Sequence, residues 1–315
     1  MSGKKAIVTG GAGFIGSHIC DALIERGIEV AVIDNLSSGK KQNLAPDAAF
    51  YEVDIRDESV RDIFAKEKPN CLFHLAAQMD VRKSVADPMY DASVNIGGTA
   101  NLLEAGRAGG LEKTIYAATG GAMYGEPKVL PADENTPIEP LCPYGISKGA
   151  AEHYLELYRK LYGMNYTSLR FPNVYGPRQD PHGEAGVVAI FSQLMLSGKR
   201  PKIFGDGTMT RDYVYVGDVV EANMLALDNG GGMAMNLGRG TEITVQQIFD
   251  GVRDAVGCDI EPDYVPERLG EVAHISLDAS LAKKTLGWEP KVELLDGLAR
   301  AVDFYRRLNA GEITR

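Results

Sequence analysis

Two tyrosines in this sequence are each followed four residues later by a lysine, a spacing that can turn a phenol into a base. The pairs are Tyr124–Lys128 and Tyr144–Lys148. Residues four apart share a helix face, and an ammonium group beside a phenol favours the phenolate. The reference pKa of tyrosine is about 10, so action near neutral pH needs a shift of roughly 3 units, or about 4 kcal/mol. Such a pair therefore predicts general acid–base chemistry.

Helix continuity distinguishes the two pairs. Pro127 lies between the members of the first pair, so no continuous helix presents them together. The second pair opens a segment without a helix breaker, which predicts a helix from Pro143 to about Leu161. We therefore take Tyr144 and Lys148 as the catalytic pair.

Thr119 is the third candidate for the chemistry. It closes a β-rich run, Thr114–Ala118, at the strand end where an active site is expected. Its hydroxyl could hydrogen-bond both a substrate oxygen and Tyr144. Taken alone, a threonine at a strand end that satisfies backbone groups would be the simpler interpretation.

A glycine-rich turn connects the first predicted strand, Lys5–Thr9, to the first predicted helix, Phe14–Arg26. Glycine lets the backbone turn sharply and lets a pyrophosphate approach the helix N-terminus, where free N–H groups favour negative charge. The strand–turn–helix context predicts a dinucleotide site. The residues expected to contact the dinucleotide here are Gly10, Gly13, Phe14, Ile15 and Gly16.

Asp34 follows the second predicted strand, Glu29–Ile33, about 20 residues after Gly13. A carboxylate at this place accepts hydrogen bonds from ribose hydroxyls and repels a 2′-phosphate. With Asn35 beside it, Asp34 favours NAD over NADP. The positive ring of oxidised nicotinamide would then add to the effect of Lys148 on the tyrosine.

Two further strand ends supply candidate cofactor contacts. The predicted strands Phe50–Asp54 and Cys71–Leu75 end at the edge of the sheet where open α/β folds bind ligands. We expect contacts to adenine and to the nicotinamide half from the residues there. These residues are Asp54, Ile55, Ala76, Ala77 and Gln78.

The alternation of short β-rich runs with helical segments predicts an α/β fold, a Rossmann-type doubly wound parallel sheet. Tyr166–Phe171 is the last predicted strand of the regular half, and the pattern becomes less regular after Pro172. We therefore expect an NAD-binding domain over residues 1–172, with a return segment near 213–240. A smaller C-terminal substrate lobe would occupy most of residues 173–315, and its last helix, Leu294–Leu308, is expected only to pack.

Composition excludes several classes of function. The net charge of −10 argues against binding to nucleic acid or to an anionic membrane surface. The four cysteines are far apart, and no histidine spacing suits a metal site. No run approaches the roughly 20 apolar residues of a membrane span, and the N-terminus has no signal-peptide pattern. We expect a cytoplasmic protein without a metal.

The motifs together resemble the extended short-chain dehydrogenase/reductase family, and within it the chain is most similar to UDP-glucose 4-epimerases of galactose metabolism. The likeness covers nearly the whole chain. It is carried by Thr9–Gly16, Asp34, His74–Ala77, Thr119, Tyr144–Lys148, Leu169–Arg178, Arg211–Val216 and Arg268–Glu271. The resemblance implies catalytic roles for Thr119, Tyr144 and Lys148, with NAD as cofactor and a UDP-sugar as substrate.

The resemblance also implies a substrate site. Asn173, Arg211 and Arg268 would hold the diphosphate, and guanidinium groups do match phosphate oxygens. Phe204 could pack on the nucleobase, although a core role is equally compatible with its type. Ile275 would lie near the part of the pocket that decides whether an N-acetyl group fits at C2.

Two glycines after Thr119 bear on the reaction. The 4,6-dehydratases of the family carry an Asp-Glu pair there, where this chain has Gly120 and Gly121. The resemblance therefore implies a 4-epimerase that oxidises C4 transiently to a 4-keto sugar. UDP-N-acetylglucosamine, UDP-glucuronate and pentose substrates stay open, as does a sugar-nucleotide reductase. A non-catalytic NAD sensor is opposed by the intact catalytic residues.

The resemblance implies a homodimer as well. In related proteins the helices corresponding to Ala92–Arg107 and Tyr144–Leu161 form a bundle between two subunits. Amphipathic periodicity alone does not show such an assembly, so the dimer is expected from the resemblance only.

Overall fold

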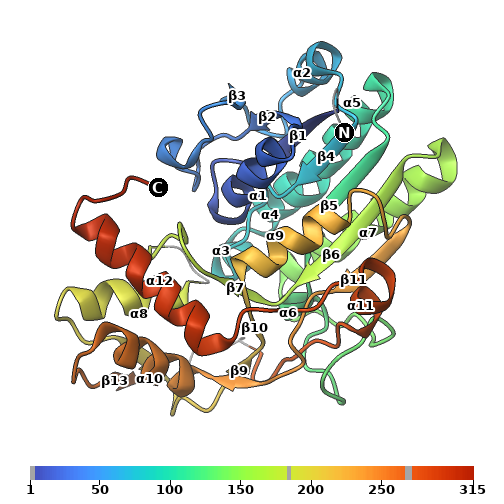
Figure 1. Cartoon of the computed structure of the whole chain (residues 1–315). Coiled ribbons are helices and arrows are strands. Elements are labelled where there is room, and N and C mark those ends of the chain that lie inside the picture. The colour runs from blue at the N-terminus through green and yellow to red at the C-terminus, as the bar shows by residue number, and fades with distance from the viewer. Residues whose placement is uncertain (1–3, 183–185, 267–271) are drawn as a thin grey trace.

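The computed structural model describes residues 4–182, 186–266 and 272–315. At its centre lies a seven-stranded sheet in the order β11-β6-β5-β4-β1-β2-β3, in which all neighbouring strands are parallel (Figure 1). Its strands are β1 (Lys5–Thr9), β2 (Glu29–Ile33), β3 (Ala49–Tyr51), β4 (Cys71–His74), β5 (Lys113–Thr119), β6 (Asn165–Phe171) and β11 (Met233–Asn236). The order reverses between β1 and β4, which is the switch point where such sheets bind ligands.

The sequence explains which strands lie at the centre. Strand β4 is buried at every position, and β1 is buried from Ala6 to Thr9. Such continuous apolar runs are typical of parallel strands covered on both faces. The expected doubly wound sheet is confirmed.

Helices cover both faces of the sheet and enclose two apolar cores (Figure 1). One face carries α1 (Phe14–Glu25), α9 (Val216–Leu225) and α11 (Ser280–Leu286). The other carries α2 (Val60–Glu67), α5 (Gly98–Gly109) and α7 (Pro143–Tyr162). The contact between α1 and α9 joins the first helix of the chain to one that follows it by some 200 residues.

Most predicted bounds agree with the structure to within one residue. Strands β1 and β2 have the predicted bounds, and α7 extends one residue past the predicted end. The prediction for β3 was wrong in length. The strand ends at Tyr51 because its carbonyl accepts hydrogen bonds from Asp34 and Val53, so the chain turns instead of continuing to Asp54.

A smaller lobe packs around a third apolar core, built by α8 (Val187–Leu196), α10 (Val245–Val256) and α12 (Leu294–Asn309). In Figure 1 these three helices lie together below the central sheet. Three two-stranded ribbons accompany them: β7 (Asn173–Tyr175) with β10 (Tyr213–Tyr215), β8 (Lys202–Phe204) with β13 (Asp263–Val265), and β9 (Thr210–Arg211) with β12 (Ile243–Thr244).

Short elements connect these layers at the carboxyl edge of the sheet and beside it. They are η1 (Lys41–Asn43), α3 (Val81–Ala86), α4 (Pro88–Ala92), the π-helical turn η2 (Ser93–Gly97) and α6 (Gly120–Met123). Within the described ranges, none of the helices has the length and apolar character needed to cross a membrane.

Candidate active site

The three expected catalytic residues meet at the carboxyl end of β5. Helix α7 begins with Pro143 at its first position, which suits proline because no N–H is needed there. Tyr144 and Lys148 therefore lie on its first turns, on one face. Thr119 ends β5, and its hydroxyl donates a hydrogen bond to the Tyr144 oxygen. The structure thus places a hydroxyl, a phenol and an amine together between the end of β5 and the start of α7.

Tyr144 does not carry the lowered pKa that its neighbouring lysine led us to expect. Burial raises the pKa of its phenol, and Cys142 and Asp91 raise it further. Only the hydrogen bond from Thr119 acts in the opposite direction. Desolvation outweighs local stabilisation because the phenolate, not the phenol, loses most by leaving water. In the protein alone, Tyr144 is therefore a neutral acid.

Lys148 is deeply buried, with 3% of its surface exposed. Its ammonium group lies 4.3 Å from the centre of the Tyr116 ring, a favourable cation–π distance. Burial lowers the pKa of Lys148 to about 7, whereas the carboxylates of Glu152 and Asp91 act to raise it. A lysine poised near neutral pH in this way is typical of a functional site.

The other tyrosine–lysine pair has no catalytic arrangement, as its proline predicted. Helix α6 ends before Tyr124, and Lys128 is exposed in a loop. The buried Tyr124 hydroxyl donates to Asn236 Oδ1 at 2.8 Å and accepts from Arg170 Nη1 at 2.7 Å. Tyr124 therefore connects the segment after Thr119 to two strands of the sheet.

Arg170 continues this connection to the catalytic helix. Its Nη2 and Nε donate to the two carboxylate oxygens of Glu152 at 2.7 and 3.1 Å. Ser168 donates to the same carboxylate at 2.6 Å. Glu152 follows Lys148 by one helical turn, so this buried, fully paired carboxylate fixes the position of α7 on β6.

The glycine turn has the shape that a dinucleotide requires. Gly10 has φ +72°, a conformation that side chains disfavour. A Cβ atom on Gly16 would lie 2.2 Å from the Gly10 carbonyl oxygen. Gly13, at the N-cap of α1, offers no side chain to cap the helix, so its first N–H groups stay available for an anion. These residues fit the pyrophosphate of NAD.

Asp34 lies beside this turn and is 6% exposed. Its Oδ2 accepts from the Ala12 N–H at 3.0 Å and its Oδ1 from the Leu36 N–H at 2.8 Å. Burial raises the pKa of this carboxyl, and the two N–H donors lower it. The side chain is thus oriented by the backbone of the turn, in the place that suits a ribose diol.

Asn35 and Asp54 form a more exposed corner next to Asp34. The Asn35 amide donates to Asp54 Oδ2 at 2.9 Å. Hydrogen bonds from Arg56 lower the pKa of Asp54 to about 2. The structure therefore brings these two expected adenosine contacts together, from strands that are neighbours in the sheet.

The other expected cofactor residues differ in what they expose. Ile55 is 4% exposed and packs in the core beneath α5. The Gln78 side-chain amide donates hydrogen bonds to Asp80 O and Asp91 Oδ1, both at 2.9 Å. Ala76 and Ala77 are half-buried at the end of β4. At Gln78 and Ile55, a bound cofactor would thus meet mainly backbone.

Of the expected substrate residues, Asn173 is brought to the catalytic corner. Its Oδ1 and the Thr119 hydroxyl lie 3.7 and 3.8 Å from the place where a Cβ on Gly121 would be. Ile275, by contrast, is 2% exposed and packs with Tyr124 and Leu277. Its side chain therefore does not line an open substrate pocket.

The remaining substrate residues are held on the small ribbons. Arg211 is partly buried on β9 and donates from Nη1 to the carbonyl oxygen of Thr210 at 2.8 Å. Phe204 is half-buried at the end of β8. Arg268 lies outside the described residues.

Asp212 is a structural residue of this region that the sequence analysis missed. Its carboxylate accepts hydrogen bonds from the backbone N–H groups of Arg239, Gly240 and Leu277 at 3.0–3.1 Å. Burial raises its pKa to about 6, and these three donors lower it. Asp212 thus fixes the loops beside Arg211. The only signal in the sequence was its place directly after that arginine.

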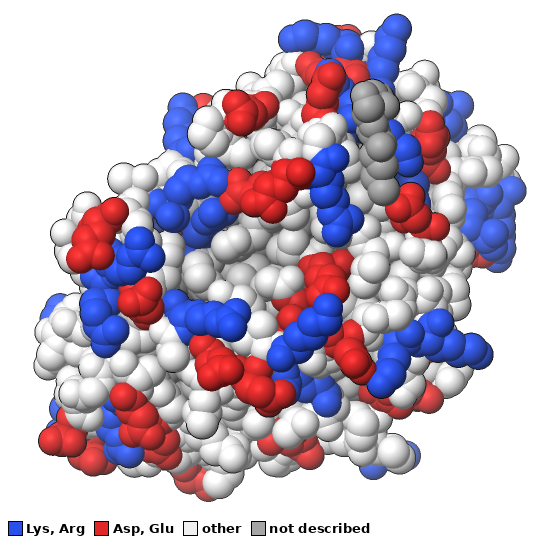
Figure 2. All heavy atoms as spheres, in the orientation of Figure 1, with Lys and Arg blue, Asp and Glu red and all other residues white. Residues whose placement is uncertain are grey.

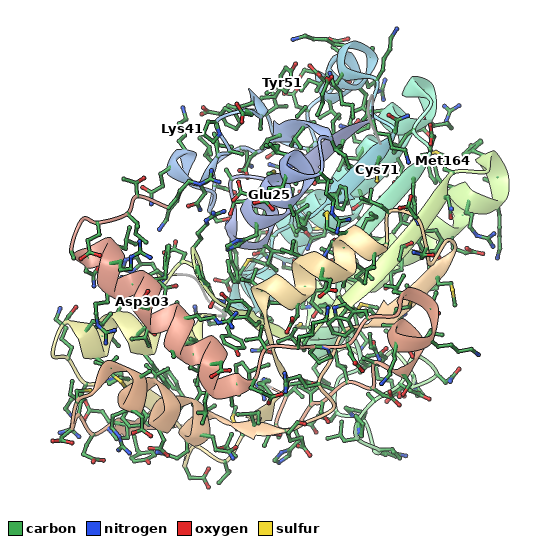
Figure 3. All side chains as sticks on the ribbon, viewed as in Figure 1. Glu25, Lys41, Tyr51, Cys71, Met164 and Asp303 are labelled. Carbon is green, nitrogen blue, oxygen red and sulfur yellow. The ribbon has the colours of Figure 1, made fainter. Side chains whose placement is uncertain are left out.

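The distribution of charge on the surface is consistent with a small anionic ligand that is bound by a few individual residues. Figure 2 shows Lys and Arg interspersed with Asp and Glu on the face drawn, without a broad basic patch. Figure 3 labels Glu25 at the end of α1 and Asp303 on α12, which mark the larger and the smaller lobe. Among the residues that the structure describes, no His, Cys, Asp or Glu cluster could hold a metal ion.

Comparisons with known proteins agree with this geometry. The NAD dependent epimerase/dehydratase family matches residues 6–238. A UDP-glucose 4-epimerase of Mycolicibacterium smegmatis is 45% identical over 96% of this chain and 98% of its own. A crystal structure of Thermotoga maritima UDP-glucose 4-epimerase with UDP-glucose is 51% identical, with TM-score 0.95, covering 97% and 99% of the two chains. The Thermus thermophilus UDP-glucose 4-epimerase complex with NAD is 45% identical, with TM-score 0.91, covering 96% and 99%.

Proposed function

The chain belongs to the NAD-dependent epimerase/dehydratase family, and on that premise we propose that it is an NAD-dependent enzyme that interconverts UDP-glucose and UDP-galactose. The observation that carries this proposal is the meeting of Thr119, Tyr144 and Lys148 at the end of β5. The same carboxyl edge of the sheet carries the glycine turn and Asp34. An isomerase fits because the coenzyme is restored in every cycle.

The side chains divide the chemistry among them. The glycine turn at the start of α1 and Asp34 would hold NAD, which would supply the hydride chemistry at C4 of the sugar. Tyr144 takes the proton from the sugar 4-hydroxyl and returns it after the 4-keto sugar has turned over. Thr119 hydrogen-bonds the Tyr144 oxygen, and this contact orients the phenol toward the sugar 4-hydroxyl. The Lys148 ammonium favours the phenolate, and the positive charge of oxidised nicotinamide adds to its effect.

The residues after Thr119 support epimerisation over dehydration. A Cβ atom on Gly120 would lie 2.4 Å from Leu277 Cδ1, so an acidic side chain there would displace a core residue. Gly121 leaves the space beside Thr119 and Asn173 open. Neither position offers the acid or base that elimination of water needs. UDP-N-acetylglucosamine and UDP-glucuronate are the alternative substrates to test, followed by a sugar-nucleotide reductase reaction.

Substrate binding is assigned to the smaller lobe and its border. Asn173, Arg211 and Arg268 would hold the diphosphate, and Phe204 would pack on the uracil ring. In this division residues 1–172 and the return segment near 213–240 bind NAD, and residues 173–315 mainly bind the sugar nucleotide. The return segment contains α9 and β11, which complete the sheet and its cover.

A homodimer is supported by an exposed apolar surface on α3, α4 and α7. Met89 on α4 is 78% exposed and Leu161 on α7 is 60% exposed. Tyr154, Leu157 and Leu161 recur at helical spacing on one face of α7. Exposed apolar side chains that share a helix face can mark an interface. The segment 92–107 is expected to share this interface, and its helical turns pack against α7. The free cysteines are compatible with a reducing cytoplasm.

The direct test is turnover without added coenzyme. Purified protein is incubated with UDP-galactose, and the products are separated by anion-exchange chromatography. Formation of UDP-glucose is the expected result, with NAD released from the denatured protein in amounts near one per chain. Failure to convert UDP-galactose, with NAD supplied and with the acetylated and uronic sugars tested in turn, would contradict the proposal.

A further inference from the structure

A buried polar network lies between the loop after β4 and the catalytic helix. At its centre is Asp91 on α4, which is 1% exposed. Its Oδ1 accepts hydrogen bonds from Gln78 Nε2 at 2.9 Å and from Asn95 Nδ2 at 3.1 Å. Its Oδ2 is fully buried and has no hydrogen-bond partner among the described residues. An oxygen in that state needs a compensating charge or an enclosed water.

Asn95 extends the network to α7. It lies in the π-helical turn η2, and such turns are frequent at functional sites. Its Nδ2 also donates to the Ser147 hydroxyl at 3.0 Å, and Ser147 directly precedes Lys148. Its Oδ1 accepts from the Gln78 N–H at 2.9 Å. The hydrogen bonds therefore hold the Asp91 carboxylate in register with the helix that carries Tyr144 and Lys148.

Two carboxylates, Glu152 and Asp91, act electrostatically on Lys148. They differ in whether another cation already pairs with them. Glu152 is neutralised by Arg170, which contacts both of its oxygens, and it also accepts a hydrogen bond from the Ser168 hydroxyl. Asp91 receives hydrogen bonds only from neutral amides. A buried carboxylate is costly without a cation nearby, and Lys148 is a buried cation on which Asp91 acts.

We infer that Asp91 is a positioning residue that holds Lys148 as an ammonium ion beneath Tyr144 and thereby sets the pH range of turnover. The inference rests on the proposed function and adds a residue outside the Thr119, Tyr144 and Lys148 set. Asp91 contacts neither the proton donor nor the acceptor of the reaction, so its effect passes through the charge of Lys148.

The sign of the effect follows from the charges around the pair. Removing the negative charge of Asp91 lowers the pKa of Lys148, since a cation loses its partner, and lowers the pKa of Tyr144, since a phenolate loses a repelling neighbour. Both limbs of the pH–kcat profile then move to lower pH, by about one pH unit. The other groups facing the pair stay in place: Glu152, His74, Cys142, Thr119 and Tyr116.

The test is Asp91→Asn, which is close in shape and keeps an oxygen for the bonds from Gln78 and Asn95. Asp87→Asn is the matched control, because Asp87 caps the same helix by accepting from the Tyr90 N–H at 2.9 Å but is exposed. We expect the kcat profile of Asp91→Asn, measured from pH 5.5 to 9.5, to shift to lower pH with KM nearly unchanged. Asp87→Asn should leave the profile in place. An unshifted profile in Asp91→Asn, whatever its height, overturns the inference, because a merely structural role lowers kcat without moving the limbs.

A second measurement covers a variant that fails to fold or to retain NAD. In the unaltered holoenzyme, the ¹³C shift of the labelled Asp91 carboxyl carbon is followed over the same pH range. An ionised carboxylate throughout supports the inference, and a protonated carboxyl at pH 6–8 overturns it. Absence of turnover in the unaltered protein contradicts the proposed function itself, and the inference falls with it. An active protein with an unshifted variant contradicts the inference alone.

Discussion

The segments around Tyr124 and Tyr144 share one spacing and one pair of residue types, yet they have different surroundings. Tyr144 and Lys148 lie on the first turns of a long helix, against Thr119 and Tyr116. Tyr124 lies at the end of a four-residue helix, and Lys128 is exposed in the loop that follows. A pair at this spacing therefore acquires chemistry where a continuous helix holds both members and a second element closes over them.

The contrast extends to the partners of the two phenols. The Tyr124 hydroxyl donates a hydrogen bond to Asn236 and accepts one from Arg170, and these two residues lie on neighbouring strands. Among the described residues, Thr119 is the one hydrogen-bond partner given for the Tyr144 hydroxyl, so this hydroxyl keeps capacity for a substrate oxygen. The hydrogen-bonding capacity of the Tyr124 hydroxyl is thus used within the fold, whereas that of the Tyr144 hydroxyl is partly available to a ligand. Substitutions at matched positions should separate these two roles.

The largest effect is expected from Tyr144→Phe. Loss of the phenol removes the group that exchanges the proton with the sugar, so kcat should fall by about a thousandfold or more. The melting temperature and the NAD content should change little, because the hydroxyl makes one hydrogen bond in the fold. Coupled measurement of UDP-glucose formation checks this. Retained activity in Tyr144→Phe would remove Tyr144 from the mechanism.

Lys148→Met should follow, with kcat lower by about a hundredfold. The methionine fills similar space over the Tyr116 ring but leaves the phenol without its neighbouring cation. Stability should fall, since Asp91 is left as a buried carboxylate without the cation on which it acts. Thermal unfolding and kcat at several pH values are the measurements. A variant with full activity and an unchanged pH profile would contradict the electrostatic role.

Tyr124→Phe should act on stability instead. It leaves Arg170 Nη1 and Asn236 Oδ1 each without one buried partner, which costs about 1–3 kcal/mol in the free energy of unfolding. Denaturant unfolding measures this cost. At a temperature where the variant is folded, kcat should stay within about threefold of the unaltered protein. A loss as large as that of Tyr144→Phe would show that the comparison between the two segments is wrong.

The smallest effect is expected from Lys128→Met. The side chain is exposed in a loop, so stability should change by less than about 0.5 kcal/mol. Activity should be unchanged, in contrast to the same substitution at Lys148. Assaying Lys148→Met and Lys128→Met side by side compares the same substitution in the two tyrosine–lysine pairs directly.

Local sequence signals predicted a large part of this molecule. Apolar runs and the glycine turn gave β1, α1 and β2 nearly to the residue, because parallel strands and helix starts depend on adjacent residues. Pro127 was enough to reject the first tyrosine–lysine pair, since proline acts within one helical turn.

What the sequence did not reveal depends on residues distant in the chain. The network of Asp91 with Gln78, Asn95 and Ser147 joins three separate segments, and only folding brings them together. The direction of the Tyr144 pKa was also missed, because it is decided by burial among several elements rather than by the spacing to Lys148. Asp212 likewise binds backbone groups 27 or more residues away.

The parallel pairing of β11 with β6 has a consequence for how the chain is made. Synthesis delivers β1 to β6 first, but the outer partner of β6 does not exist until residue 236 has left the ribosome. Helix α9, which covers α1, arrives only shortly before it. A nascent chain that has exposed β6 but not yet β11 therefore presents an unpaired strand edge and an uncovered apolar face, surfaces prone to association with other chains.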